Sequence, residues 1–339
     1  MQIRCAILVS NSRYSITDAG RYLCAMAQNA HPAEPAPALS PDTDLWSAGA
    51  PFGRMITAMI TPFREDGSLD LDGAQKLAAH LVDAGNDGLV VSGTTGESPT
   101  TSDAEQAELL RAVHEAVGDR ATVIAGVGTN DTAHTLELAR QAEALADALL
   151  VVTPYYNKPT QEGLYRHFTA VADHTAKPVM LYDIPHRSGI PIEVDTLKRL
   201  AGHDKIVAVK DAKGDLVAGS EVMAATGLAY YSGDDPLTLP WLSVGAVGVV
   251  SMSGHLAAPR IRAMIAAYLA GEVTEAARLH AELLPVHAGV TSLPGVISLK
   301  AAMNMLGLPG GPVRLPLVEA TEEQQARLKT FLAQGGVKI

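Results

Sequence analysis

The feature of this sequence that most constrains its fold is a repeated alternation, from residue 54 onward, between short apolar runs and longer segments with helical spacing. Most of the runs are apolar at successive positions and rich in Val, Ile and Thr, as expected for parallel strands buried on both faces. The eight runs are Met55–Thr61, Gly88–Ser92, Thr122–Ala125, Ala148–Thr153, Pro178–Tyr182, Ile206–Val209, Leu228–Tyr231 and Val247–Ser251.

Helical segments separate these runs, and their apolar residues recur at three- and four-residue spacing. Three helix starts carry expected caps, which are Asp70, Ser102 paired with Glu105, and Thr132. The segments are Leu71–Ala84, Asp103–Val117, Thr132–Leu145, Gln161–Thr175, Val194–Ala201, Asp215–Thr226 and Thr238–Gly245. Eight strands, each followed by a helix, predict an α/β fold of the (β/α)8 TIM barrel class. An open doubly wound sheet is the weaker interpretation, because no Gly-rich turn follows the first run.

We divide the chain into three regions. Residues 54–257 are expected to form the barrel, and residues 258–339 a C-terminal helical appendage with helices at Arg260–Ala270, Thr274–Ala288, Leu299–Leu306 and Thr321–Ala333. Residues 1–53 show no sustained period and include an Ala-Pro stretch, so we expect a disordered extension or a start codon assigned too far upstream. We assign no chemistry to this extension.

Composition excludes several classes of protein. The net charge of -11 argues against binding to nucleic acid, whose protein partners are basic, and favours a cytoplasmic protein. Two cysteines, Cys5 and Cys24, are too few for a disulfide framework or a thiolate metal cluster. The stretch from Pro236 to Pro259 carries no formal charge but holds three prolines and three glycines, so we interpret it as buried barrel rather than membrane span.

Polar residues follow five of the expected strands. In a (β/α)8 barrel the chemistry lies at the carboxyl ends of the strands, so these residues should converge on one mouth. The segments are Gly93–Glu97, Pro154–Asn157, Tyr182–Gly189, Lys210–Asp211 and Ser232–Asp235.

Lys210 is the most informative of these residues because it follows an apolar strand. Desolvation lowers the pKa of a lysine, and a lysine with a pKa of about 7–8 can form an imine with a ketone. The alternative is a strand-end lysine that reaches water or pairs with Asp211.

The other candidates also have two interpretations each. Tyr182 can transfer protons or simply expose its hydroxyl to water. The turn at 93–96 can hold a carboxylate with backbone N–H groups and hydroxyls, or can merely connect a strand to a helix. Arg187 can bind a carboxylate or lie on the surface. The eleven histidines show no metal-binding spacing, and the Gly-x-Ser-x-Gly motif of a serine hydrolase does not occur.

Together these segments resemble those of the pyruvate-dependent, Schiff-base class I aldolases, the superfamily that includes dihydrodipicolinate synthase and N-acetylneuraminate lyase. The resemblance covers about Met55 to Pro316 and includes Arg-Leu-Pro-Leu at 314–317. The Pro-Tyr-Tyr-Asn-Lys-Pro-Thr-Gln string at 154–161 and Arg187 make the chain most similar to the dihydrodipicolinate synthases of lysine biosynthesis.

The resemblance implies a reaction and its site residues. Pyruvate would condense with L-aspartate 4-semialdehyde to give 4-hydroxy-tetrahydrodipicolinate, without a metal or organic cofactor. The resemblance implies that Lys210 forms the imine and that Thr94 and Thr95 bind the pyruvate carboxylate. It implies that Arg187 binds the semialdehyde carboxylate and that the Gly233 carbonyl and Val250 line the pocket. Thr95, Tyr182 and a neighbouring subunit's Tyr156 would form a proton relay. The relay would require a homo-oligomer, which we expect to be a homotetramer built from two dimers.

The sequence departs from the family pattern in three places. Asp183 stands where the family has Asn, and we expect it to face the barrel wall. His255 lies in an altered segment at 251–255, where we expect changed subunit packing. In the cleft where family members bind inhibitory lysine, Asp103, Gln106 and His134 occupy key positions and Asn130 is retained, so we expect weak or absent inhibition by lysine.

Two alternative functions remain open. The chain can be a related aldolase or dehydratase acting on 2-keto-3-deoxy sugar acids, although Arg187 favours a partner that carries a carboxylate. It can also be a non-catalytic barrel that binds a keto acid, although a binding module has no need of an imine-forming amine.

Overall fold

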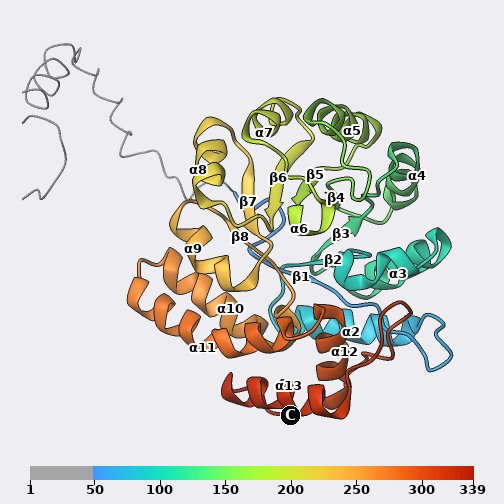
Figure 1. The fold of residues 1–339 in the computed structure, drawn as a ribbon, viewed down its shortest axis with the longest axis vertical. Coiled ribbons are helices and arrows are strands. Elements are labelled where there is room, and N and C mark those ends of the chain that lie inside the picture. The colour runs from blue at the N-terminus through green and yellow to red at the C-terminus, as the bar shows by residue number, and fades with distance from the viewer. Residues whose placement is uncertain (1–48) are drawn as a thin grey trace, which may run out of the picture. The chain divides into compact units, whose positions relative to one another are not determined.

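The strands form a closed parallel barrel (Figure 1). In the computed structural model, which describes residues 49–339, each strand pairs with the next along the chain and the last pairs with the first. The strands are β1 (Met55–Ala58), β2 (Gly88–Val91), β3 (Thr122–Gly126), β4 (Ala148–Val152), β5 (Val179–Asp183), β6 (Ile206–Asp211), β7 (Ala229–Ser232) and β8 (Gly248–Ser251). The predicted (β/α)8 barrel is confirmed.

Helices surround the barrel and follow the strands in the predicted order (Figure 1). The helices of the barrel are α2 (Leu71–Asp83), α3 (Asp103–Val117), α4 (Thr132–Ala142), α5 (Gln161–His174), α6 (Pro185–Ser188), α7 (Val194–Leu200), α8 (Leu216–Ala225), α9 (Thr238–Ser243) and α10 (Gly254–Leu269). Three short 3-10 turns also follow strands: η1 (Thr94–Gly96), η2 (Ser98–Thr100) and η3 (Asp235–Leu237).

Both faces of the strands are buried, which explains why the runs are continuously apolar. Val90 and Ile124 point inward and pack in a cluster made almost entirely of strand residues. Leu89 and Val123 point outward and pack against helical residues such as Leu77. The alternation of side chains along a strand thus serves two cores, and a polar residue at a strand end lies either inside the barrel or behind it.

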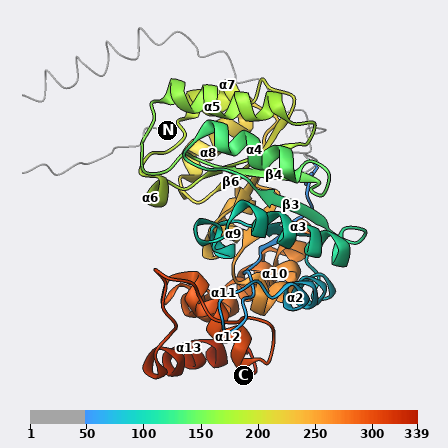
Figure 2. The same ribbon diagram turned by 90° about the vertical axis from the view of Figure 1, so that its right-hand side faces the viewer.

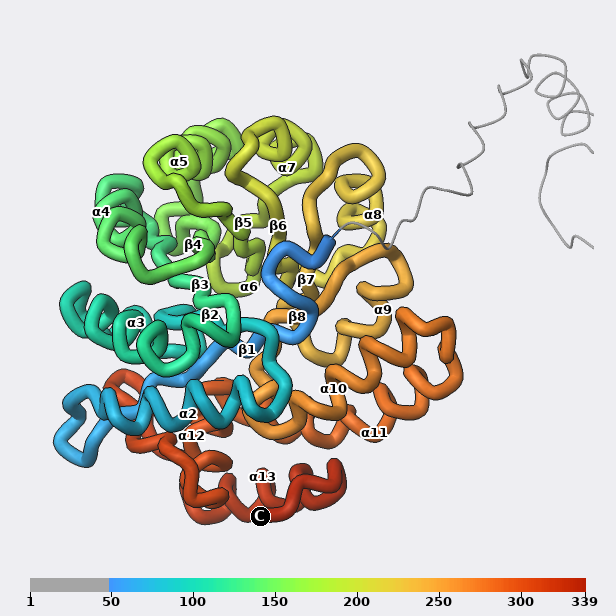
Figure 3. The backbone as a smooth tube through the Cα atoms, turned by 180° about the vertical axis from the view of Figure 1, so that it is seen from behind, coloured from blue at the N-terminus to red at the C-terminus, as the bar shows by residue number. Residues whose placement is uncertain are grey.

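The segment before β1 crosses one end of the barrel (Figure 3), and Phe52 packs there in the interior cluster. It precedes β1, is 2% exposed, and its backbone N–H donates to the Tyr231 hydroxyl at 3.2 Å. Its ring lies 6.2 Å from that of Tyr231, which points into the barrel. The opposite end, where α6 follows β5, is the one seen in Figure 1.

The C-terminal helices α11 (Val273–Thr291), α12 (Gly295–Met305) and α13 (Glu322–Gln334) form a layer beside α10 and α2 (Figure 2). Met55 of β1 and Ile261 of α10 belong to the same buried cluster as Leu283 of α11 and Leu328 of α13. The appendage therefore shares a hydrophobic core with the barrel, and all described residues belong to one compact unit.

Several details differ from the sequence predictions. The helix expected from Arg260 is the longer part of α10, which a kink at the non-helical Ala257 separates from a short turn that begins at Gly254. The third helix cap is Asp131, whose carboxylate accepts from Ala133 N, rather than Thr132. The caps at Asp70 and Ser102 are confirmed.

The extension predicted at 1–53 falls mainly outside the described residues, as do both cysteines. Among residues 49–339, no helix is long and apolar enough to cross a membrane. Within the same residues, no group of three or more His, Cys, Asp or Glu side chains is arranged to hold a metal ion.

Candidate active site

Lys210 and Tyr182 lie side by side inside the barrel. The register of the sheet pairs Tyr182 of β5 with Lys210 of β6, and both side chains point inward. The Lys210 Nζ lies 4.1 Å from the centroid of the Tyr182 ring. The expected strand ended at Val209, but β6 continues through Asp211, so Lys210 lies within the strand. The strand thereby fixes the amine against the phenol.

The Lys210 amine is buried, with the residue only 5% exposed. Burial lowers the pKa of Lys210 to about 8, Asp235 opposes this shift, and the positive charge of Arg187 adds to it. About a tenth of the amine is then unprotonated at pH 7, far more than for an ordinary lysine, and the unprotonated form is the one that attacks a carbonyl carbon. The alternative of a solvated, fully charged lysine does not fit this burial.

Tyr182 is buried beside the amine, and burial raises the pKa of its phenol well above the usual value. The Thr94 side chain is a hydrogen-bond partner of this phenol and opposes the shift, as does the charge of Arg187. The phenol therefore remains protonated and can donate a proton or accept one through its oxygen. The relay threonine predicted from the sequence was Thr95, but the structure places Thr94 against Tyr182.

Thr94 and Thr95 lie in η1, directly after β2. The turn is tied to the end of β1, because the Thr61 hydroxyl donates to the Gly96 carbonyl at 2.6 Å. It ends at Glu97, which has the left-handed φ of 57° that is uncommon outside glycine. The turn is therefore held from both sides, with Thr94 facing the phenol and Thr95 buried.

A cavity of about 500 Å³ opens at the carboxyl ends of the strands. Its walls include six of the predicted site residues: Thr94, Thr95, Tyr182, Arg187, Lys210 and Gly233. A smaller cavity of about 200 Å³ adjoins it, shares Thr94, Tyr182 and Arg187, and extends to Tyr155. The strand-end rule thus identified residues that do converge on one cavity.

Two predicted residues do not line the larger cavity. Val250 is 1% exposed and packs in the barrel interior. Tyr156 is 89% exposed and has a left-handed φ of 73°, so its ring points away from this subunit. Neither residue contributes to the cavity within one chain.

The cavity also contains polar residues that the sequence analysis left without a role. Glu97, His186 and Asp234 line it, each a few residues beyond the end of β2, β5 or β7. Burial raises the pKa of Asp234, the nearby Asp235 raises it further, and His186 opposes the shift. The same strand-end rule points to all three, but sequence alone gave no reason to choose them.

Asp183 lies behind the site, as predicted from its expected place at the barrel wall. It is fully buried, accepts a hydrogen bond from Ile192 N at 3.1 Å, and lies 3.3 Å from Lys213 Nζ. Burial raises its pKa to about 6, against the opposing charge of Lys213. Asp183 lines neither cavity, so its carboxylate lies behind the cavity wall.

His255 is a core residue of this chain. Its Nε2 accepts from Ile60 N at 3.1 Å, its Nδ1 lies 2.8 Å from the Met252 carbonyl, and it is 4% exposed. Burial lowers the pKa of His255 to about 4, so the ring is neutral. The ring connects the segments that follow β1 and β8 within one subunit, and the expected change in subunit packing stays a prediction.

The side chains at three positions of the expected lysine cleft have partners within the chain. His134 Nε2 lies 3.0 Å from both carboxylate oxygens of Asp103. The Gln106 amide donates to the backbone carbonyls of Ser98 and Thr101. These side chains are thus already engaged within the chain.

Comparison with known proteins agrees with this geometry. Residues 51–335 match the sequence model of the dihydrodipicolinate synthetase family. A 4-hydroxy-tetrahydrodipicolinate synthase of Streptomyces coelicolor is 63% identical over 290 residues, which are 85% of this chain and 97% of that protein. The corresponding enzyme of Acidothermus cellulolyticus is 64% identical over 288 residues, 85% of this chain and 94% of the relative.

Solved structures show the same relationship. Dihydrodipicolinate synthase of Cyanidioschyzon merolae, crystallised with lysine bound, is 41% identical with a TM-score of 0.83, over 85% of this chain and 99% of that one. The Bacillus anthracis enzyme is 44% identical with a TM-score of 0.81, over 83% of this chain and 98% of that one. Sequence, fold and cavity agree, and the chain belongs to the dihydrodipicolinate synthetase family.

Proposed function

We propose that this chain is a 4-hydroxy-tetrahydrodipicolinate synthase, a class I aldolase-type lyase that condenses pyruvate with L-aspartate 4-semialdehyde in lysine and diaminopimelate biosynthesis. The observation that carries the proposal is the buried Lys210 amine, with its lowered pKa, beside the Tyr182 phenol in an open cavity. The names of the relatives from Streptomyces coelicolor and Acidothermus cellulolyticus support the same activity.

The reaction uses Lys210 as a nucleophile. The free amine attacks the pyruvate ketone, and the resulting carbinolamine loses water to give an imine. The imine makes the pyruvate methyl group acidic, and loss of a proton gives an enamine that attacks the aldehyde carbon. The amino group of the second substrate then adds to the imine carbon and displaces Lys210, which closes the ring. One water is released overall, and no step calls for a metal or organic cofactor.

Tyr182 and Thr94 supply the proton transfers of these steps. Carbinolamine formation and dehydration need a proton delivered to the substrate oxygen and removed from the nitrogen, within hydrogen-bond reach of the reacting atoms. The phenol lies against the amine, and Thr94 is its hydrogen-bond partner. We assign the relay to Thr94 in place of Thr95, and keep Thr95 as a ligand of the pyruvate carboxylate together with the Thr94 backbone.

Arg187 binds the carboxylate of the semialdehyde. It lies on α6 at the exposed rim of the cavity, where its guanidinium can meet a second substrate that enters after pyruvate. Gly233 also lines this cavity, and we assign its carbonyl to the wall of the pocket. Val250 supports the site from the barrel interior. A 2-keto-3-deoxy sugar acid would require hydroxyl-binding groups at the position of Arg187.

Tyr156 completes the relay from a neighbouring subunit. A large aromatic ring that is 89% exposed, on a backbone held in the left-handed region, fits a residue that is covered on association. We therefore propose a homo-oligomer in which dimers exchange this tyrosine, assembled as a homotetramer in the cytoplasm. One structural relative, 36% identical with a TM-score of 0.82, is described as a monomeric dihydrodipicolinate synthase variant, so the oligomeric state needs its own measurement.

A coupled assay with both substrates tests the proposed reaction. The wild-type protein should turn over pyruvate with L-aspartate 4-semialdehyde, and Lys210→Ala should abolish turnover. Activity with a 2-keto-3-deoxy sugar acid and none with the semialdehyde would support the alternative aldolase. Binding of pyruvate without turnover of either substrate would support a non-catalytic barrel.

A further inference from the structure

The C-terminal region contacts the turn that holds Thr94 and Thr95. α12 packs beside η1, and Pro294, Val296 and Leu317 form part of the cavity wall. Between these two parts of the chain lies Glu97, the residue that ends η1 and is 3% exposed. None of the roles assigned above explains this buried carboxylate.

Both oxygens of Glu97 contact the C-terminal region, one in an ion pair and the other in a hydrogen bond. Its Oε1 lies 2.5 Å from Lys300 Nζ of α12. Its Oε2 accepts from the Arg314 backbone N–H at 3.0 Å. These contacts fix a residue whose left-handed backbone sets the path of the chain directly after the turn.

Lys300 is as buried as its partner, with a side chain 2% exposed. Its Nζ also donates to the Pro312 carbonyl at 2.7 Å and lies 4.0 Å from the centroid of the Phe63 ring. A buried charge without its partner is strongly unfavourable, so Glu97 and Lys300 depend on each other. Their pairing joins segments that lie far apart in the sequence.

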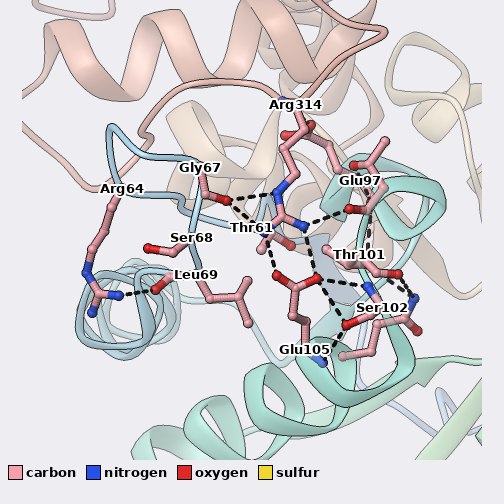
Figure 4. Close-up of polar contacts among 12 residues, drawn as sticks. Thr61, Arg64, Gly67, Ser68, Leu69, Glu97, Thr101, Ser102, Glu105 and Arg314 are labelled. Atoms are coloured by element: carbon pink, nitrogen blue, oxygen red, sulfur yellow. Dashed lines mark hydrogen bonds and ion pairs between the residues drawn. The ribbon is translucent and has the colours of Figure 1, made fainter.

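Arg314 secures the residues around this pair (Figure 4). Its guanidinium donates to the carbonyls of Gly67 and Thr100, both at 2.7 Å, and forms an ion pair with Glu105 at 2.5 Å. Lys300 thus binds the Glu97 side chain, and Arg314 binds the backbone of the following residues at Thr100. Little freedom remains for the turn to shift.

We propose that Glu97 and Lys300 are positioning residues, which hold the Thr94–Thr95 turn in the geometry that binds the carboxylate of pyruvate. The inference rests on the proposed function, because it assigns the turn to that substrate. The pair touches neither reacting atom and acts through the backbone of η1. The C-terminal helices are then part of the substrate site as well as of the hydrophobic core.

Trapping of the pyruvate imine with borohydride, at increasing pyruvate concentration, tests this role. In Glu97→Gln and Lys300→Met the pyruvate concentration for half-maximal trapping at Lys210 should rise by about tenfold, because the carboxylate site is misplaced. The KM for the semialdehyde should change by less than about twofold in the same proteins. The double variant should show no larger increase than the single variants, because the two residues act as a unit.

Lys198→Met is the matched control, because Lys198 forms an ion pair of similar length, 2.7 Å, with Glu221 on the far helices α7 and α8. It should keep the wild-type pyruvate dependence. Lys300→Arg should restore part of the lost pyruvate binding. If Lys300→Met does not fold, Glu97→Gln decides, because it preserves the shape of the side chain.

A folded Glu97→Gln protein with the wild-type pyruvate dependence of trapping would overturn the inference. An equal rise in the pyruvate concentration for half-maximal trapping and in the KM for the semialdehyde would also overturn it. Both results would reduce the pair to a contribution to stability. Absence of trapping in the wild-type protein would instead remove the proposed function, and the positioning role with it.

Discussion

Lys210 gives the reaction a pH dependence that follows from its surroundings. Burial in the barrel lowers its pKa from 10.5 to about 8, so the nucleophilic form appears as the pH rises through that value. The rate of imine formation with pyruvate should therefore increase with pH and level off above about 8. Rapid-mixing measurements of imine formation across this range check the prediction. A rate that keeps rising toward pH 10.5 would indicate a solvated amine and contradict it.

Arg187 is expected to discriminate between the two substrates. Arg187→Ala should raise the KM for the semialdehyde by an amount equivalent to about 1–3 kcal/mol, because the substrate carboxylate loses a charged partner. The KM for pyruvate should stay close to that of the wild-type protein. Steady-state kinetics with each substrate varied in turn separate the two effects. An unchanged KM for the semialdehyde would remove this assignment, and Arg187→Lys should give an intermediate value.

At the scale of single elements, the turn η1 places two neighbouring threonines in different environments. Thr94 contacts the Tyr182 phenol, whereas Thr95 is buried in the turn. Thr94→Val should therefore lower kcat about a hundredfold, as expected for loss of a proton-transfer partner. Thr95→Val should chiefly weaken pyruvate binding. Parallel kinetics of the two variants decide the assignment, and a larger loss of kcat in Thr95→Val would reverse it.

The same elements show what the sequence could and could not predict. Parallel strands have a strong local signature, and the rule for their carboxyl ends located Lys210 and Tyr182 because it needs only chain order. The choice between Thr94 and Thr95 depended on the twist of a three-residue turn, which no periodicity encodes. The Glu97–Lys300 contact was also invisible, because tertiary packing alone brings these residues together.

At the scale of the whole molecule, Tyr156 connects activity to assembly. If Tyr156 acts in a neighbouring subunit, mixing inactive Lys210→Ala and Tyr156→Phe proteins should restore about a quarter of the wild-type activity. About half of the randomly formed dimers are then mixed, and each mixed dimer has one intact site of two. Activity after denaturation and joint refolding measures this recovery. Each variant refolded alone is the control. No recovery in mixed dimers would place Tyr156 in the relay of its own subunit, and full activity of Tyr156→Phe alone would place it outside the relay.

The expected lysine cleft predicts weak regulation of the assembled protein. His134 and Asp103 bind each other, and Gln106 binds the backbone, so these groups are engaged before any ligand arrives. L-lysine should therefore inhibit poorly, although a relative from Cyanidioschyzon merolae was crystallised with lysine bound. Titration of the activity with L-lysine tests this expectation. Inhibition with a constant below about 1 mM would contradict it.

The account depends above all on imine formation at Lys210, which borohydride reduction in the presence of pyruvate can detect. Digestion and mass spectrometry of the reduced wild-type protein should show one reduced pyruvate on the peptide that contains Lys210, and none in Lys210→Ala. Protein that carries no adduct, or carries it on another lysine, would contradict the central claim.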